Sequence, residues 1–278
     1  MAEPLLTVIV PVHNVHQYLD RSLESIVAQT YQNIEIIIVD DCSTDDTGKM
    51  ADAWAKRDQR ITVLHLAENR GISGARNVGL ARARGQFVTF ADGDDWLEPD
   101  ICQFYVDKMQ QYRLDFVACG YYVNPGNTTW SGKAKDTFVK KRPLLRLVRK
   151  MHSPIRGYTW NKCYRLDVIR QYDLKFDEQI TLMEDQIFNV AYVLHTSRYL
   201  YNITPLYHYF QRPGSSIHQP NFKKAKDVTK AITTIQMSIW RHEWQQAALN
   251  LKNNYKNKAP RLSRPLSKDR NKESESKY

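Results

Sequence analysis

Short apolar runs alternate with helical patterns along the first 120 residues. The runs are rich in β-branched residues, which is typical of strands buried on both faces of a parallel sheet. They predict strands at Leu5–Val10, Ile34–Val39, Ile61–His65, Gln86–Ala91 and Phe116–Tyr121. Strands that alternate with helices form a mostly parallel sheet with helices on both faces, so we expect a Rossmann-like α/β fold.

Apolar residues at helical spacing predict a helix after each of the first four strands. The second helix is expected to open at Ser43, because Ser43 and Asp46 resemble a capping box with Asp in place of Glu. The apolar positions of the other three are Leu19, Leu23, Ile26 and Val27; Ile72, Ala75, Val78 and Leu80; and Ile101, Phe104, Tyr105, Met109 and Tyr112.

The pattern becomes less regular after Tyr121. Two further helices are predicted, at Glu184–His195 and from Phe222 to about His242, and disorder is expected from Asn250 because large apolar residues almost disappear there. The expected organisation is a ligand-binding half at 1–121, a second half of the same domain at 122–220, a helix at 221–249 and a basic tail at 250–278.

Polar residues follow three of the predicted strands directly. Ligands of parallel α/β sheets bind at the carboxyl ends of the strands, so these residues are candidates for a site. They are Pro11 to Asn14, Asp40 to Ser43, and Asp92 to Asp95. Taken singly, Asp40 or Asp41 equally suits a helix cap or a turn.

The cluster Asp92-Gly93-Asp94-Asp95 is harder to explain as a turn alone. Three neighbouring carboxylates repel one another, and a divalent cation removes that repulsion. Gly93 allows the backbone to bend so that Asp92 and Asp94 converge on one ligand. Carboxylates together with diphosphate oxygens suit Mn²⁺ or Mg²⁺, so we favour a metal role over a solvated acidic turn.

A glycine-containing segment, Glu68 to Gly79, lies between the third and fourth strands. A helix N-terminus there would offer free N–H groups to an anion, and Arg70 and Arg76 add positive charge. An ordinary loop-to-helix junction is the alternative. The glycine spacing is not that of a dinucleotide-binding loop or of a P-loop, so nicotinamide chemistry and P-loop phosphoryl transfer lose support.

These motifs, in this order, resemble the family 2 glycosyltransferases with a GT-A fold. The resemblance covers residues 5 to about 120 and is carried by Val8–Asn14, Ile38–Asp45, Asn69–Asn77 and Asp92–Asp95. Later segments resemble, more loosely, the acceptor half of bacterial members that assemble polysaccharides: Trp160–Tyr164, Met183–Gln186, Tyr207–Tyr209 and Arg212–Ser216.

The resemblance implies transfer of a sugar from a nucleotide-sugar, usually a UDP-sugar, to an acceptor hydroxyl with inversion. The acceptor is a glycan or a lipid-linked saccharide. The implied roles are nucleotide binding for Pro11, His13, Asp41 and Asp92, metal binding for Asp94, and general base for Asp185.

Several of these positions depart from the family pattern or suit another role. His13 stands where Tyr or Phe is more usual in the family, although an imidazole also stacks on a base. Without the resemblance, Glu184 and Asp185 equally suit acids in the first turn of a helix. Trp160 and Glu184 are the candidates for acceptor binding, although core packing explains most such aromatic residues.

Positive charge gathers in the last part of the chain. Residues 221–278 hold 14 Lys and Arg against 5 Asp and Glu, and a second basic cluster lies at Lys133–Lys150. Such runs are most often a solvated face; attachment to an anionic membrane surface is the sharper interpretation. An acid near the N-terminus and the lack of a long apolar stretch favour a cytoplasmic protein, peripheral to the membrane at most.

Two other classes remain in competition. A nucleotidyltransferase that makes nucleotide-sugars uses a similar sheet and paired acids, but needs a basic glycine-rich loop where this chain has Pro11 to Asn14. A basic module that adheres to nucleic acid would suit the tail, although no base-reading motif is present and specific binding is not expected.

Overall fold

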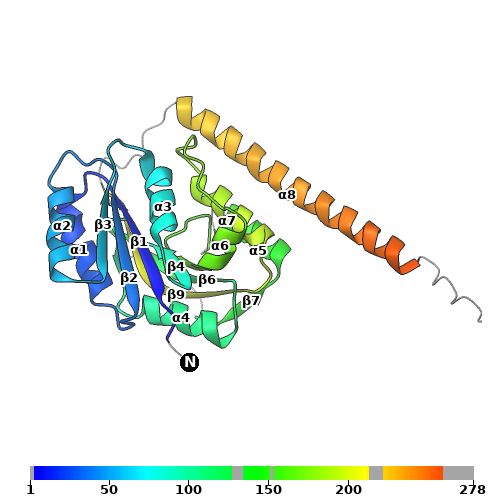
Figure 1. Cartoon of the computed structure of the whole chain (residues 1–278), viewed down its shortest axis with the longest axis horizontal. Helices are drawn as coiled ribbons and strands as arrows, with labels where there is room; N and C mark the ends of the chain where they lie inside the picture. The colour runs from blue at the N-terminus through cyan, green and yellow to red at the C-terminus, as the bar shows by residue number, and fades with distance from the viewer. Residues whose placement is uncertain (1–2, 127–133, 151–152, 154, 213–221, 259–278) are drawn as a thin grey trace, which may run out of the picture. The chain divides into compact units, whose positions relative to one another are not determined.

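The structure, a computed structural model, describes residues 3–126, 134–150, 153, 155–212 and 222–258 (Figure 1). Its strands are β1 (Leu6–Val12), β2 (Ile34–Asp40), β3 (Ile61–His65), β4 (Phe87–Phe90), β5 (Trp96–Leu97), β6 (Phe116–Asn124), β7 (Thr137–Val139), β8 (Lys162–Arg165) and β9 (Tyr199–Phe210). Its helices are α1 (His16–Val27), α2 (Thr47–Arg57), α3 (Gly71–Arg82), α4 (Ile101–Gln111), α5 (Lys141–Arg149), α6 (Leu166–Gln171), α7 (Glu184–Leu194) and α8 (Phe222–Lys258).

The strands form one mixed sheet in the order β3-β2-β1-β4-β8-β6-β9-β5, with β7 paired to β9. The first four in this order are parallel, and β6 is parallel to β9. Strand β8 runs antiparallel between β4 and β6. Therefore β4 and β6 point the same way, and the carboxyl ends of β1, β2, β4, β6 and β9 share one edge of the sheet.

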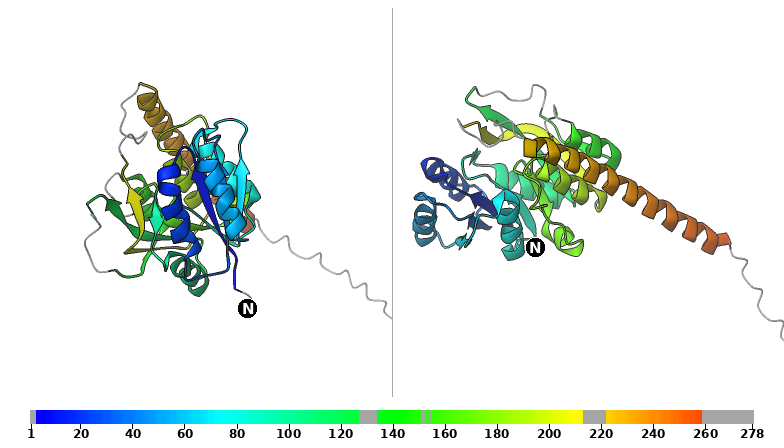
Figure 2. Two further views of the ribbon diagram at one scale, coloured as in Figure 1. Left: turned by 90° about the vertical axis from the view of Figure 1, so that its left-hand side faces the viewer. Right: turned by 90° about the horizontal axis from the view of Figure 1, so that it is seen from above.

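Alternation along the strands divides the core into two layers. In β1, Leu6, Val8 and Val10 face a cluster that includes residues of α1, α2 and α4, whereas Ile9 faces a cluster with residues of α3, α5, α6 and α7. Successive side chains of a strand point to opposite faces, so a strand buried on both sides is apolar throughout. The predicted sheet with helices on both faces is confirmed (Figure 2).

Two sequence predictions about helices were wrong. Helix α2 begins at Thr47 rather than at Ser43, and the Ser43 hydroxyl instead accepts the Asn14 N–H at 3.1 Å. The Thr47 N–H donates to the Asp45 carboxylate at 2.9 Å. Helix α8 continues to Lys258, where disorder was expected from Asn250. Polar residues such as Lys, Asn and Gln have no need of a packed face to continue a helix already begun. The remainder of the predicted tail, 259–278, lies outside the described residues.

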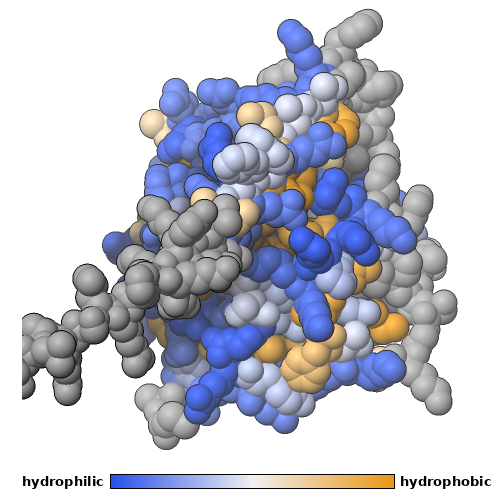
Figure 3. Space-filling model, turned by 90° about the vertical axis from the view of Figure 1, so that its right-hand side faces the viewer, coloured by the Kyte–Doolittle hydropathy of each residue, from blue (hydrophilic) through white to orange (hydrophobic). Residues whose placement is uncertain are grey.

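The contacts divide the chain into two units, Met1–Ile239 and Trp240–Tyr278, so the division falls inside α8. In the first unit, Ala231 and Ile235 of α8 are buried, and Asp227 accepts hydrogen bonds from Thr181. The face drawn in Figure 3 is mostly hydrophilic, with apolar residues in smaller groups. Among the described residues, every helix is too short or too polar to cross a bilayer.

A buried carboxylate interrupts the apolar run of β2. Glu35 is 6% exposed and accepts hydrogen bonds from the Thr7 hydroxyl at 2.5 Å, the Gly85 N–H at 3.0 Å and the Arg84 side chain at 3.0 Å. Burial alone raises the pKa of Glu35, but the hydrogen bonds from Thr7 and Arg84 outweigh it, so the pKa lies below its ordinary value. Glu35 thus joins β1, β2 and the turn that leads into β4.

We expect Glu35→Gln to lower the free energy of unfolding by about 1–3 kcal/mol at pH 7, because buried N–H and O–H groups lose a charged acceptor. A depressed folded-state pKa contributes stability that is present above the unfolded-state pKa and is lost as the pH falls through the folded-state value. Urea unfolding at pH 7 and pH 4 measures this, with the exposed Glu24→Gln as control. A deficit that is equal at both pH values contradicts the prediction.

Candidate active site

The loops that follow β1, β2 and β3 are tied together at the carboxyl edge of the sheet. Asp41 is 3% exposed, and its carboxylate accepts the Arg70 N–H at 2.7 Å. Its carbonyl lies 2.8 Å from the His13 ring, and the Asn69 amide donates to it at 3.3 Å. Pro11 is buried within β1, whereas His13 is exposed. The structure therefore brings Pro11, His13 and Asp41 to one place, as the sequence predicted.

Arg70 reaches this place through its backbone more than through its side chain. Its guanidinium contacts Glu178 at 2.8 Å and 3.0 Å, and Glu178 also accepts a hydrogen bond from the Asn77 amide. Both members of the ion pair are partly exposed, so solvent screens it. The positive charge of Arg70, which we predicted to attract an anion, is thus paired with a carboxylate from the second half of the chain.

The three acids that follow β4 have different surroundings. The Asp95 side chain is buried and accepts hydrogen bonds from the Tyr207 hydroxyl at 2.6 Å and the Phe210 N–H at 2.7 Å. The same hydroxyl accepts the Asp92 N–H at 3.0 Å. Burial raises the pKa of Asp95 well above its ordinary value. Asp95 therefore attaches the acidic turn to β9 and does not face a ligand.

The carboxylate of Asp94 is paired with an arginine. Its side chain is 19% exposed and pairs with Arg212 Nε at 3.0 Å. Burial first, and the nearby charge of Asp92 second, raise the pKa of Asp94 to about 6. Carboxylate oxygens are ligands that Mg²⁺ and Mn²⁺ prefer, and an ion bound here would compete with Arg212 for Asp94.

The donor set decides what such an ion would need. The described residues contain no group of three or more His, Cys, Asp or Glu side chains arranged to hold a metal. With so few protein ligands, Mg²⁺ or Mn²⁺ would bind only if oxygens of the substrate and water molecules completed its coordination shell. The residues therefore fit an ion that arrives with a diphosphate, held by Asp94, rather than one held by protein alone.

The remaining acids, Asp92, Glu184 and Asp185, surround a buried arginine. The Arg76 side chain, 1% exposed, donates to Asp92 at 3.0 Å and to Asp185 at 2.5 Å, and lies 3.6 Å from Glu184. Its Nε has no hydrogen-bond partner among the residues that the structure describes. The sequence predicted that Arg76 faces a nucleotide; the structure instead surrounds its guanidinium with carboxylates.

Glu184 and Asp185 open α7, where Met183 in the left-handed region, with φ of 72°, turns the chain into the helix. The second oxygen of Asp185 accepts the Thr159 N–H at 3.2 Å. Burial raises the pKa of Glu184 to about 7 and raises that of Asp185, which the Arg76 guanidinium counteracts. An acid in a half-buried position near the strand ends has the surroundings of a proton acceptor.

Trp160 does not offer a face to a ligand. It is 2% exposed and stacks on Tyr207 at 4.4 Å and on Tyr158 at 4.6 Å between ring centroids. Tyr158 and Tyr209 lie above it and are only partly buried. The prediction that Trp160 contacts the acceptor is therefore wrong, because its ring is already covered by other aromatic rings. Trp160 instead supports the tyrosine rings that pack on it.

Sequence reasoning missed three contributors to this site: the pairing of Tyr207 with Asp95, the ion pair of Arg212 with Asp94, and the buried Lys162. Lys162 Nζ donates to the carbonyl groups of Arg156 and Tyr158. The available signal was a lysine followed directly by Cys163 and Tyr164 at the start of a strand, since lysine is almost never fully buried without partners.

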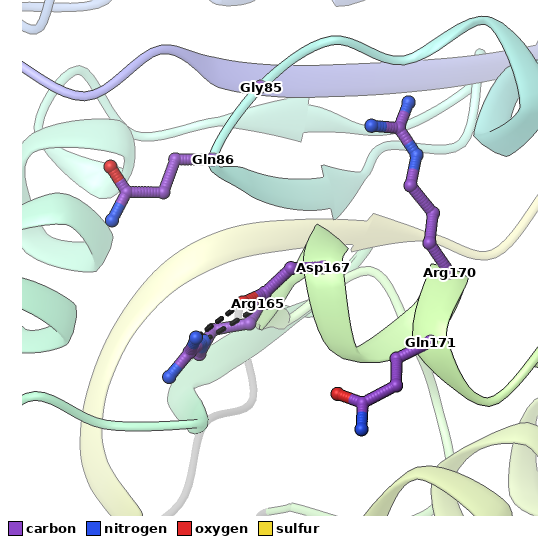
Figure 4. Close-up of a pocket in the computed structure, with 6 residues that line it drawn as sticks. All are labelled: Gly85, Gln86, Arg165, Asp167, Arg170 and Gln171. Carbon is purple, nitrogen blue, oxygen red and sulfur yellow. Dashed lines mark hydrogen bonds and ion pairs between the residues drawn. The ribbon is translucent and has the colours of Figure 1, made fainter.

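A hollow of about 590 Å³ lies elsewhere, at the opposite edge of the sheet (Figure 4). It is lined by Gly85 and Gln86 before β4 and by Arg165, Asp167, Arg170 and Gln171 at the end of β8 and in α6. Arg165 already pairs with Asp167 beside it (Figure 4). None of the acids described above borders this hollow, so we do not assign the chemistry to it.

Known proteins resemble the chain over most of its length. The uncharacterized glycosyltransferase EpsJ of Bacillus subtilis is 34% identical over 81% of this chain, which spans only 66% of that relative. Staphylococcus aureus TarS in complex with UDP-GlcNAc has the same fold, with a TM-score of 0.72, 24% identity and 84% and 66% of the two chains covered. The mannosyltransferase PcManGT of Pyrobaculum calidifontis, in complex with GDP-Man and Mn²⁺, has a TM-score of 0.56, 18% identity and 91% and 80% covered.

The sequence model of one protein family also matches this chain. The glycosyl transferase family 2 model covers residues 7–172, which is more than half of the chain and includes β2 to β8 and all but the first residue of β1. Within this range lie the loops after β1, β2 and β4 that form the site. The chain therefore belongs to glycosyl transferase family 2.

Proposed function

We propose that the protein transfers a sugar from a nucleotide-sugar, most simply a UDP-sugar, to a hydroxyl of a glycan or lipid-linked acceptor in bacterial surface polysaccharide synthesis. The observation that carries this is the placement of Asp185 at the sheet edge where Asp41, Asp92 and Asp94 lie. Family membership and the glycosyltransferase names of the relatives support it. The same match disfavours a nucleotidyltransferase or a nucleic-acid module.

The donor would lie along the loops after β1, β2 and β4. In the proposal, Pro11 and His13 flank the base, Asp41 hydrogen-bonds to it, and Asp92 contacts the ribose. The hydrogen bonds among these loops support the assignment, because they hold the contacting groups in place before a ligand arrives. Arg70 contributes its backbone N–H to Asp41, and its side chain becomes available to a diphosphate if Glu178 releases it.

Inversion requires a single displacement at the anomeric carbon. The acceptor oxygen attacks while the nucleoside diphosphate leaves, and Asp185 accepts the hydroxyl proton. Asp185 keeps unoccupied lone pairs although both of its oxygens already accept a hydrogen bond. Glu184 beside it is proposed to bind the acceptor. A divalent ion on Asp94, when bound, supplies Lewis-acid stabilisation of the leaving diphosphate.

We expect Asp185→Asn to lower turnover roughly 10²–10⁴-fold, because the amide cannot accept the proton. Hydrolysis of UDP-GlcNAc, with water as the acceptor, provides the assay, and calorimetry with UDP should show nearly unchanged affinity. The exposed Asp107→Asn on α4 is the matched control. Wild-type turnover in Asp185→Asn would require a different base, and absence of both UDP binding and hydrolysis in the wild type would refute the proposed function.

We expect activity to disappear in EDTA and to return with Mn²⁺ or Mg²⁺, and Asp94→Ala to be inactive under all three conditions. The reason is that Asp94 is the proposed protein ligand of the ion. Circular dichroism should show an intact fold, because the Asp94 side chain is not part of the core. Asp46→Ala, an exposed acid ahead of α2, serves as control, and full activity in EDTA would exclude the metal role.

We further propose that the protein attaches peripherally to an anionic membrane surface, where a lipid-linked acceptor would be found. The support is the basic composition of residues 221–278 and two exposed aromatic rings in α8. Trp240 and Trp244 are 62% and 64% exposed, with centroids 6.1 Å apart, and Arg241 lies between them in sequence. Tryptophan is enriched at membrane interfaces, and each basic residue near an anionic leaflet contributes about 1 kcal/mol.

We expect the full chain to co-sediment with anionic vesicles at low salt and to be released at high salt, because salt screens the attraction. The Trp240→Ser/Trp244→Ser variant should bind more weakly at the same ionic strength. Neutral vesicles are the control. Equal binding to both kinds of vesicle, or none to anionic vesicles at low salt, would contradict membrane attachment.

A further inference from the structure

Arg76 lies where the two halves of the chain meet. Its NH2 group donates to Asp92, which follows β4, and its NH1 group donates to Asp185, which opens α7. The two amino groups of a guanidinium are held in one plane at a fixed separation. One side chain thus sets the position of the proposed base relative to the acid of the donor side.

The surroundings of Arg76 leave no room for direct contact with a nucleotide. The side chain is 1% exposed, and the rings of Phe90 and Phe176 lie 5.9 Å and 5.4 Å from its guanidinium carbon. Gly79, one turn further along α3, packs against β1 so closely that a Cβ would lie 2.4 Å from Ile9. The helix is therefore held against the sheet, and Arg76 with it.

The charges around Asp185 come from several elements. Arg76 of α3, Asp92 after β4 and Glu184 of α7 act on it, together with Lys162 of β8 and, at longer range, Tyr158 and Tyr164. Burial lowers the pKa of Lys162 to about 7. Burial acts on Arg76 in the same direction, but the three carboxylates outweigh it and its pKa is raised. Arg76 is the permanent cation among these residues.

We propose that Arg76 is a positioning residue for sugar transfer: its guanidinium places a positive charge beside the Asp185 carboxylate and fixes the distance of that carboxylate from Asp92. This inference rests on the proposed function, because it assigns Asp185 the role of base. Burying a guanidinium is costly unless it is paired, and here the pairing joins the proposed base to the donor side. Arg76 itself touches neither substrate.

The test compares Arg76→Met, which removes the charge, with Arg76→Lys, which keeps the charge but loses the planar fork. The exposed Arg82→Met, on the same helix, is the control. Two quantities are followed against pH: the rate of UDP-GlcNAc hydrolysis, and the ¹³C chemical shift of the Asp185 carboxyl in protein with labelled aspartate. The Asp185 resonance is assigned by its absence in Asp185→Asn.

We expect the titration midpoint of Asp185, and the acidic limb of the rate profile, to move up by about 1–3 pH units in Arg76→Met, because a nearby opposite charge depresses a carboxyl pKa by that amount. In Arg76→Lys the midpoint should stay close to that of the wild type while turnover falls, since geometry alone is lost. If Arg76→Met does not fold, Arg76→Met/Glu184→Gln, which removes one buried negative charge as well, takes its place.

Three results would overturn the inference. An unchanged Asp185 midpoint in Arg76→Met with weakened UDP affinity would make Arg76 a nucleotide contact. An unchanged midpoint with only a lower melting temperature would make it a packing residue. Equal midpoints and rates in Arg76→Lys and wild type would remove the geometric role. The carboxyl shift is measured without turnover, so an inactive wild type would refute the proposed function while the Arg76 inference is still decided.

Discussion

Burying the guanidinium of Arg76 removes a permanent charge from water, and this costs several kcal/mol unless the charge is paired. The pairing here needs carboxylates from the loop after β4 and from the start of α7, which are about a hundred residues apart. The second half of the chain must therefore dock on the first in one register only. Buried ion pairs add little net stability in general, but a wrong register would leave a buried charge unpaired, which is strongly unfavourable.

The acids of the site show how partners decide the role of identical side chains. Asp95 is buried against Tyr207 and a backbone N–H, so it joins β9 to the turn after β4. Asp94, one residue earlier, meets the side chain of Arg212 near the surface. Because residues 92–95 form a turn, closed by the hydrogen bond from the Asp95 N–H to the Asp92 carbonyl at 3.0 Å, neighbouring carboxylates enter different environments. The cluster Asp92–Asp95 correctly indicated the place of the site, but Asp95 does not face it.

Most strands and helices of the first half of the fold could be predicted from the sequence, and fewer of those in the second half. Strand β1 was predictable because all of its residues are buried, and burial on both faces favours a nearly continuous apolar run. Placing β8 was not possible, since its four residues carry little periodicity and its neighbours β4 and β6 are both distant in sequence. The strand-end positions of Asp41 and Asp94 followed from local order. The partners of Arg76 and Trp160 did not, because burial of a polar or aromatic group is decided by contacts across the whole chain.

Strand β8 closes a gap that earlier parts of the chain cannot close. It is the only strand hydrogen-bonded to β4 on the side away from β1 within the described residues, and it also pairs with β6. While the chain emerges from the ribosome, residues up to about 160 expose the unpaired edges of β4 and β6. Such edges template pairing with other chains. Synthesis of Lys162–Arg165 therefore covers the edge of β4 and the facing edge of β6, whereas the other edge of β6 stays unpaired until β9 has been made.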